Sequence, residues 1–326
     1  MWVGGRGCRQ ADRSRRYSIP TADPKGASMD ADLDLLLIAV YCTVDDFLPK
    51  RAENARRRIS DAEVITLCIA QAMMGIPSDA RFLRSARRQL GHLFPHLPER
   101  TAYHKRRLRL SGTIEALIRQ FAQHCPGFYD DLLLVDSTPV ECARSRETVK
   151  RGGASSLGDA LANAAEYGYC ASHSRHFWGF RLHTLFAMDG TPRALALTSP
   201  KIDERVVCLG LVERCERAPG QTLILIGDKN FRGKQFEEDL ATLDAKIMRP
   251  RRKDEPGHGP HLAPIRQRIE SIYWTCKDIL TLERHGARTL ENLRVRIATR
   301  FVALTAAIAL NHHLGRPSRS LACYTA

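Results

Sequence analysis

Two aspartates follow short apolar runs that are typical of buried strands. Asp136 ends the run Asp131-Leu-Leu-Leu-Val-Asp136, and Asp228 ends Leu223-Ile-Leu-Ile-Gly-Asp228. Ligands of α/β sheets bind where strands end, so we expect both carboxylates at one edge of a sheet. A single acid in such a position is more often a helix cap or an ion-pair partner. Two of them favour a functional site.

A third acid stands in the pattern Arg266-x3-Glu270-x6-Lys277. Residues four and seven apart on a helix share roughly one face, so all three side chains are expected together. The simpler interpretation is an exposed ion pair between Arg266 and Glu270. However, Ile269 and Tyr273 indicate an apolar stripe beside Glu270. We therefore predict that Glu270 faces the strand ends.

Three carboxylates at a strand-end cleft suit Mg²⁺, a hard cation that prefers oxygen ligands. Two such ions can stabilise the attacking and the leaving oxygen of a phosphoryl transfer, without a protein nucleophile. Asp136, Asp228 and Glu270 are therefore the predicted catalytic residues and metal ligands, with Mn²⁺ as an alternative to Mg²⁺. Such a cluster in a basic protein predicts cutting or joining of a nucleic-acid backbone.

The composition fits this chemistry. The chain has 326 residues, a net charge of +14 and 44% hydrophobic residues, which excludes a mostly disordered chain and favours polyanionic partners. Its longest apolar stretches cover about half of a membrane span, so no membrane association is expected. Ten scattered cysteines form no C-x-x-C pair. Without a secretion signal they predict reduced thiols in the cytoplasm.

Four regions are expected along the chain. Residues 1–28 are rich in Gly, Arg and Ser and predict a disordered extension, and Met29, where a helical pattern begins, is a second candidate start. Residues 29–125 predict only helices, with Ser60-x-x-Glu63 as a capping box. Residues 126–312 mix strand and helix patterns, and 313–326 form a tail. The predicted fold class is thus α/β with an N-terminal all-helical region.

Positive charge is concentrated in that helical region. Between Arg81 and Arg109 there are nine basic residues and one acid. Short helices, tight turns and a basic helix suit a helix-turn-helix-like DNA-binding module, although a solvated helical face gives the same pattern. The predicted DNA contacts on the basic helix are Arg100, Lys105, Arg106 and Arg107.

The region 126–312 has a recognisable order of elements. Phe177–Ala187 and Pro192–Thr198 alternate like strands around the turn signal Asp189-Gly190. The remaining predicted elements are helices at 203–215, 236–243, 265–282 and 289–310, strands at 222–226 and 246–248, and a loop at 249–262. Mixed strands and helices in this order indicate a mixed sheet flanked by helices.

With these motifs in hand, the chain resembles DDE transposases of bacterial insertion sequences, and is most similar to the insertion sequence 982 family. The resemblance covers about 29–326. It rests on Asp136-Ser-Thr-Pro-Val140, the hairpin from Phe177, Gly227-Asp-Lys-Asn-Phe231, the basic loop from Arg249 and the segment from Ile269 to Arg288. Two positions depart from the usual motifs. Ala263 stands where a wider insertion-sequence signature has Tyr, and Asn230-Phe231 replaces Gly-Tyr.

The resemblance implies a ribonuclease H-like core that depends on Mg²⁺ and maps the acidic triad onto Asp136, Asp228 and Glu270. It implies cutting of double-stranded DNA at terminal inverted repeats and joining of the 3′-hydroxyl to target DNA. A homodimer is expected because two ends must be paired, and the DNA substrate places the protein at the bacterial nucleoid.

Further basic residues near the expected cleft are predicted to contact DNA. A flexible basic loop adds sequence-independent affinity for phosphates. The predicted contacts are Lys229, Arg249, Arg251, Arg252, Lys253, Arg266 and Lys277. Trp274 is expected to pack in the core, with stacking on an extruded base as the less favoured alternative.

Two rival functions stay open from the sequence alone. The first is a DNA-binding protein whose core has lost catalysis, and the second is a host nuclease that cuts without joining. Loss of activity in an Asp136→Ala variant separates the first rival from a transposase. Formation of joined product separates the second.

Overall fold

The computed structural model describes residues 29–49, 58–143, 161–170, 174–252, 254–255 and 262–325. The predicted extension 1–28 lies outside these residues. None of the described helices is both long and apolar enough to cross a membrane.

The described residues of the first region are helical, as the sequence predicts. The helices are α1 (Met29–Phe47), α2 (Asp61–Met73), α3 (Asp79–Gln89), α4 (Arg100–Arg109) and α5 (Ser111–Ala122). The capping box at α2 is confirmed, because the Ser60 hydroxyl accepts from the Glu63 N–H while the Glu63 carboxylate accepts from the Ser60 N–H. Gly75, in the left-handed region at φ +61°, follows α2 where the sequence predicts a break.

The second region is built on one mixed sheet. Its strands are β1 (Leu132–Ala143), β2 (Glu166–Cys170), β3 (Arg175–Ala187), β4 (Pro192–Thr198), β5 (Leu223–Ile226) and β6 (Ala245–Met248). The order is β2-β3-β1-β5-β6, and β4 also pairs with β3. β3 is antiparallel to β1, β2 and β4, whereas β5 and β6 run parallel to β1. The α/β fold class with a mixed sheet is therefore confirmed.

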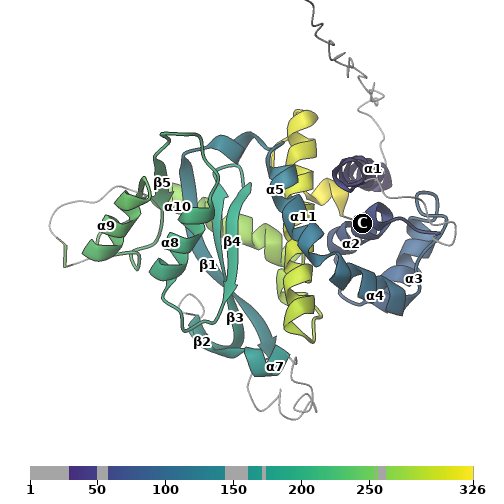
Figure 1. Ribbon diagram of the computed structural model, residues 1–326, viewed down its shortest axis with the longest axis horizontal. Helices are drawn as coiled ribbons and strands as arrows, with labels where there is room; N and C mark the ends of the chain where they lie inside the picture. The colour runs from purple at the N-terminus through teal and green to yellow at the C-terminus, as the bar shows by residue number, and fades with distance from the viewer. Residues whose placement is uncertain are drawn as a thin grey trace, which may run out of the picture.

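Helices cover both faces of this sheet (Figure 1). They are α8 (Glu204–Arg214), α9 (Lys234–Thr242), α10 (Ala263–Trp274) and α11 (Leu290–His313), with the short α7 (Leu161–Ala164) beside β2. Short turns complete the chain: η1 (Pro126–Tyr129), η4 (Thr275–Ile279), η5 (Leu282–Arg284) and η6 (Ala322–Tyr324).

Alternation along β1 separates two cores. Leu133 and Val135 pack with α8 and α9, while Leu134 belongs to the larger cluster that contains α10 and α11. Successive side chains of a strand point to opposite faces, so Asp136 follows Leu134 onto the α10 face. Ile226 of β5 belongs to the same larger cluster. Asp228, two residues later, is therefore also assigned to the α10 face of the sheet.

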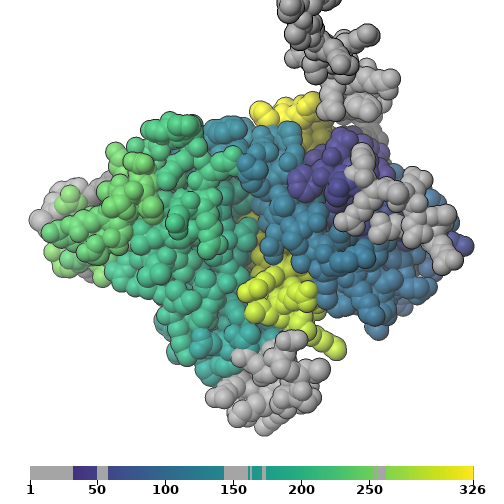
Figure 2. All heavy atoms as spheres, in the orientation of Figure 1, coloured from purple at the N-terminus to yellow at the C-terminus, as the bar shows by residue number. Residues whose placement is uncertain are grey.

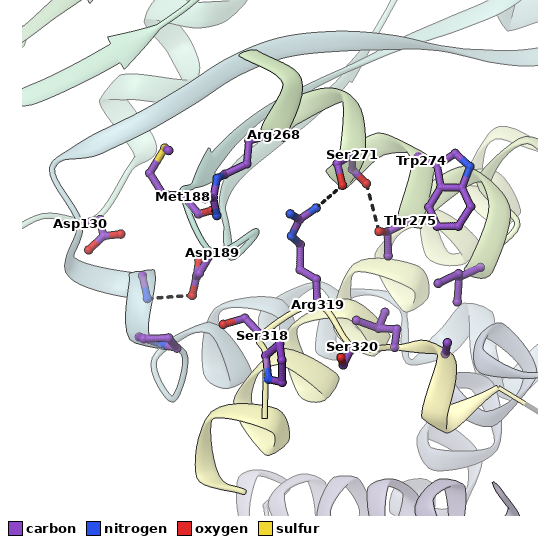
Figure 3. A pocket seen from close by; sticks show the side chains of 16 residues that line it. Asp130, Met188, Asp189, Arg268, Ser271, Trp274, Thr275, Ser318, Arg319 and Ser320 are labelled. Carbon is purple, nitrogen blue, oxygen red and sulfur yellow. Dashed lines mark hydrogen bonds between the residues drawn. The ribbon is translucent and has the colours of Figure 1, made fainter. Parts of the chain in front are cut away.

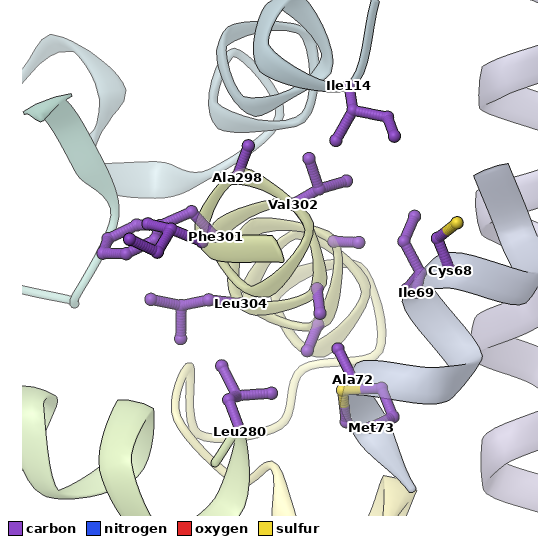
Figure 4. Packing of buried hydrophobic residues seen from close by; sticks show 14 of the residues in the cluster. Cys68, Ile69, Ala72, Met73, Ile114, Leu280, Ala298, Phe301, Val302 and Leu304 are labelled. Carbon is purple, nitrogen blue, oxygen red and sulfur yellow. The ribbon is translucent and has the colours of Figure 1, made fainter. Parts of the chain in front are cut away.

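Helix α11 joins the two regions. Its central residues are buried all round, which is typical of a helix inside a large core. Figure 4 shows Phe301 pointing to the sheet, Ala298 and Val302 near Ile114 of α5, and the side chains of α2 on another flank. In Figure 2 the N-terminal helices and the sheet region form two lobes with the C-terminal residues between them.

Most predicted elements are found within one to three residues of their expected bounds. The hairpin β3–β4 and its turn at Gly190, with φ +98°, are confirmed. Three features differ. The strand β2 was not predicted, and the strand expected to end at Asp136 continues to Ala143. The helix expected over 265–282 ends at Trp274, where a π-helical turn, η4, follows. Asp203 caps α8, since its carboxylate accepts from the Arg205 N–H.

Candidate active site at the sheet edge

Asp136 and Asp228 lie on neighbouring parallel strands. Leu134 of β1 is level with Ile226 of β5, the last residue of that strand. Each aspartate comes two residues later, so the two positions are level at the point where the strands separate. Gly227 makes this approach possible, because a Cβ there would lie 2.8 Å from the Phe231 ring and 3.1 Å from Val135. The two predicted acids are thus near each other, but Asp136 lies inside β1 and not at its end, because that strand continues to Ala143.

Protein surrounds the Asp136 side chain, although part of it still reaches solvent. Burial, together with the negative charges of Glu204 and Asp228, raises the pKa of Asp136 to about 7. A 2.8 Å hydrogen bond from the Ser137 N–H and the charge of Arg266 oppose this shift. The balance leaves a carboxyl group whose negative charge is poorly compensated by its neighbours.

Asp228 starts a tight loop after β5. Its carboxylate accepts from the Asn230 N–H at 2.7 Å and from the Asn230 side-chain amide at 2.9 Å. The Arg252 guanidinium donates to the Lys229 carbonyl at 3.1 Å. Asn230, the residue that departs from the usual motif, therefore orients the second aspartate. The basic loop contacts the same turn.

Helix α10 packs against β1 at Asp136. The Tyr273 hydroxyl donates to the Asp136 carbonyl at 3.0 Å and lies 2.6 Å from the Thr184 hydroxyl of β3. Arg266 is close enough for its charge to act on Asp136. Glu270 lies between Arg266 and Tyr273 on α10 and is exposed. The helix that carries Glu270 is thus fixed against the strand that carries Asp136.

A fourth acid, Glu204 at the start of α8, was missed by sequence reasoning. Its carboxylate accepts from the Ser137 hydroxyl at 3.0 Å and pairs closely with Arg181 of β3. It approaches from the α8 side of the sheet, opposite α10. In the sequence, Glu204 is an ordinary acidic residue in the first turn of a helix. Its two partners, Ser137 of β1 and Arg181 of β3, come together only because these strands pair.

Lys277 does not continue the face of Arg266 and Glu270 as simple helical spacing predicts. The π-helical turn η4 changes the register after Trp274, since its hydrogen bonds span five residues. The Lys277 ammonium lies 3.1 Å from the Glu283 carboxylate. Lys277 is therefore held by an acid beyond the end of the helix.

The predicted DNA contacts differ in availability. Arg100, Lys105, Lys229, Arg251 and Arg252 are exposed, while Arg106 pairs with Asp61 and Arg249 pairs with Glu255. Lys253 lies outside the described residues.

Arg107 is a correction to the sequence prediction. It is 1% exposed and donates two 3.0 Å hydrogen bonds to Asp79, so its guanidinium cannot reach a phosphate in this fold. The side of α4 that carries Arg107 packs against α2, α3 and α11. Fewer basic residues of α4 are therefore exposed to DNA than the sequence suggests.

The side-chain donors determine whether this site can hold a metal ion. Among the described residues, no three His, Cys, Asp or Glu side chains are close enough together to hold a metal ion. Asp136 and Asp228 do form a pair of oxygen donors with uncompensated charge, which fits a hard divalent cation. The third carboxylate is not in place beside them.

A protein-family model described as the transposase DDE domain matches residues 128–306, which is more than half of the chain, and the chain belongs to this family of transposases. A comparison with curated proteins finds no match. The matched segment begins just before β1 and ends within α11, so it contains Asp136, Asp228 and Glu270.

Proposed function

We propose that this transposase cuts DNA at the ends of an insertion sequence and joins the freed 3′-hydroxyl to target DNA. The observation that carries the proposal is the pair Asp136, inside β1, and Asp228, just after the neighbouring strand β5, with the pKa of Asp136 raised to about 7 by burial and by neighbouring acids. Two neighbouring carboxylates attract a divalent cation, and such a cation can take part in phosphoryl transfer. The mixed sheet with helices on both faces supports a ribonuclease H-like core.

Asp136 and Asp228 would hold Mg²⁺, or Mn²⁺ in its place, and Glu270 would complete the ligand set. Glu270 is favoured over Glu204 because α10 covers the face of the sheet to which the two aspartates are assigned, and because Glu204 is already paired with Arg181. When bound, the cation would stabilise charge on the oxygens of the reacting phosphate.

The remaining residues of the site position the DNA and the acids. Arg266 lies near Asp136 and can pair with a phosphate oxygen. The Tyr273 hydroxyl donates to the Asp136 carbonyl and holds α10 against β1. This hydrogen bond therefore limits how far Glu270 of α10 can lie from Asp136. Lys229, Arg251 and Arg252 are exposed around the Asp228 loop and can add affinity for the phosphate backbone.

We further propose that the N-terminal helices bind the terminal inverted repeats through exposed residues of α3 and α4. Arg100 and Lys105 remain available there, together with Arg81, Arg84, Arg87 and Arg88. Because two ends must be paired, the active form would be a homodimer acting on the DNA of the bacterial nucleoid. The motif order seen in the sequence supports the insertion sequence 982 family.

The test uses labelled duplex DNA carrying the ends of the element. We expect cleaved and joined products with Mg²⁺ and none with a chelator. Asp136→Ala should lower both by roughly 10³-fold or more, as expected when a group that acts as part of a catalytic unit is removed. Asp131→Ala is the matched control, since Asp131 precedes the same strand and is exposed. Equal activity of Asp136→Ala and wild type would contradict the proposal.

The third acid is tested by two further variants in the same assay. Glu270→Gln should abolish cleavage while leaving duplex binding intact, whereas Glu204→Gln should keep measurable cleavage. The reverse result would assign the third carboxylate to Glu204. Cleaved product without joined product would support a host nuclease instead of a transposase.

A further inference from the structure

A large groove lies along α10. It has a volume of about 860 Å³ and is bounded by α10, by the β3–β4 turn at Asp189 and by the C-terminal segment after α11. Figure 3 shows Arg268 and Ser271 of α10 on one side of this groove, Ser318, Arg319 and Ser320 on another, and Trp274 at one end.

Two arginines of the groove have no carboxylate partner among the described residues. Arg268 donates to the Met188 carbonyl at 3.4 Å, and Arg319 donates to the Ser271 hydroxyl at 2.8 Å. Burial and the nearby charge of Arg268 lower the pKa of Arg319, so the two guanidinium groups repel each other. A bound anion between them would relieve this repulsion.

The charge of Asp189 partly offsets this repulsion at Arg319, but neither arginine forms an ion pair with an acid among the described residues. The Asp189 carboxylate already accepts from the Gly127 N–H, the Thr191 N–H and the Thr191 hydroxyl, at 2.8–3.0 Å. Burial and the charge of Asp189 raise the pKa of Asp130. The groove therefore has a positive wall beside acids that are engaged in the hairpin turn.

Trp274 adds a flat apolar surface at the mouth of the groove. Its side chain is 58% exposed, which is unusual for a tryptophan and contradicts the expectation that it packs in the core. Trp274 is four residues after Glu270, so the two are neighbours on α10. The groove thus begins one helical turn from the proposed third carboxylate.

We propose that this groove binds an unpaired DNA strand, with a base stacked on Trp274 and a phosphate between Arg268 and Arg319. Its volume is within the range of about 300–1,000 Å³ typical of small-ligand sites, so it admits one or two nucleotides but not a duplex. Stacking on an aromatic face does not depend on the base, and arginines track the backbone. The proposal rests on the proposed function, because the strand would come from the DNA held at Asp136.

The test measures binding of a short oligothymidylate, about ten nucleotides long, to the full-length chain without metal. Binding is monitored by tryptophan fluorescence and by the anisotropy of a label on the oligonucleotide. We expect quenching on binding, and Trp274→Phe should lose it. Trp274→Ala should weaken binding about tenfold, within the range measured for stacked bases. Trp178→Phe is the control, since Trp178 is half-buried against Tyr167. Unchanged quenching in Trp274→Phe would overturn the proposal.

The phosphate contact is tested by salt dependence. Each lost contact to a single strand should reduce the slope of log K against log salt by about 0.7. Arg268→Gln and Arg319→Gln should each show this reduction, while Arg214→Gln, at the exposed far end of α8, should not. Unchanged slopes in both groove variants, or binding of duplex with no binding of single strands, would overturn the groove assignment.

The two proposals can fail separately. Asp136→Ala should bind the oligothymidylate as the wild type does, because Asp136 does not line the groove. Intact strand binding without any cleavage by the wild type would contradict the proposed function and leave the groove standing. Intact cleavage of duplex ends together with no response of Trp274 would contradict the groove alone.

Discussion

Two aspartates, Asp79 and Asp136, are surrounded by protein in similar measure but in opposite electrostatic settings. Asp79 of α3 binds Arg107 at 3.0 Å and Arg296 at 2.6 Å. Burial alone would raise the pKa of Asp79, but these two arginines outweigh it and hold the pKa at about 2. At Asp136 burial also raises the pKa, and the nearest acids add to it, so the value is about 7.

The difference separates a structural acid from a functional one. The Asp79 cluster consists of Asp79 of α3, Arg107 of α4 and Arg296 of α11, and it joins these three helices. Arginines outnumber acids in it. Burial and the neighbouring Arg296 and Arg107 lower the pKa of Arg300 to about 9. The sheet edge at Asp136 has an excess of carboxylate instead. Strongly perturbed acids that lack a counter-charge are candidates for function, and those that have one are candidates for stability.

The largest expected effect is on catalysis at the sheet edge. Asp136→Asn should lower strand cleavage by roughly 10³-fold while leaving the free energy of unfolding of the metal-free protein unchanged or higher, because a poorly compensated buried charge is removed. Cleavage assays and denaturant titrations measure the two quantities. A large loss of stability would mean that Asp136 resembles Asp79 in its role.

The next effect is on stability at the helical junction. Asp79→Ala should reduce the free energy of unfolding by about 3–5 kcal/mol, since Arg107 and Arg296 would remain buried without their partner. Urea unfolding followed by circular dichroism tests this. Asp46→Ala, at the exposed end of α1, is the control and should change little. A loss below about 1 kcal/mol in Asp79→Ala would show that the cluster is not structural.

Divalent cations should stabilise one region only. At about a hundred times its dissociation constant, Mg²⁺ should add about 2.7 kcal/mol to the stability of the wild type. Asp136→Asn should lose most of this gain, whereas Arg106→Gln, in the helical region, should keep it. Melting temperatures with and without Mg²⁺ provide the measurement. The same gain in Asp136→Asn would place the metal elsewhere.

Acid should act on the Asp79 cluster in a defined direction. The folded-state pKa of about 2 lies below the ordinary value of 3.8, so the contribution of Asp79 is complete above pH 4 and is lost as the pH falls toward 2. We expect on the order of 2 kcal/mol from this group. Asp79→Asn should therefore show a shallower decline over that window. Parallel declines would refute the assignment.

The smallest effect is expected at an exposed ion pair. Arg119 donates to both oxygens of Glu216, but the Arg119 side chain is 62% exposed. Arg119→Gln should change stability by less than about 1 kcal/mol, because solvent screens the pair. Thermal unfolding measures this. A loss comparable to that of Asp79→Ala would mean that burial does not decide the strength of these pairs.

The sequence predicts what depends on short spacing. The strand end before Asp228, the capping box at Ser60 and the hairpin turn at Gly190 are local patterns, and the structure contains each of them. The strand end expected at Asp136 is wrong, because β1 continues to Ala143 through its pairing with β3. The α/β class followed from the order of these elements.

What the sequence did not predict depends on contacts between distant segments. Arg107 was assigned to DNA because its acid, Asp79, lies outside the basic run and is 28 positions away. Glu204 meets Ser137 only through the packing of α8 on β1 and β3. The strand β2 carries exposed tyrosines and no apolar alternation, so only its pairing with β3 defines it.

The most direct test of the central claim is Mn²⁺ binding followed by electron paramagnetic resonance, in the wild type and in variants of the two contrasted aspartates. The uncompensated carboxylates of the sheet edge predict that the wild type and Asp79→Asn bind Mn²⁺ and that Asp136→Asn does not. Equal Mn²⁺ binding by Asp136→Asn and the wild type would contradict the assignment of the sheet edge as the metal and catalytic site.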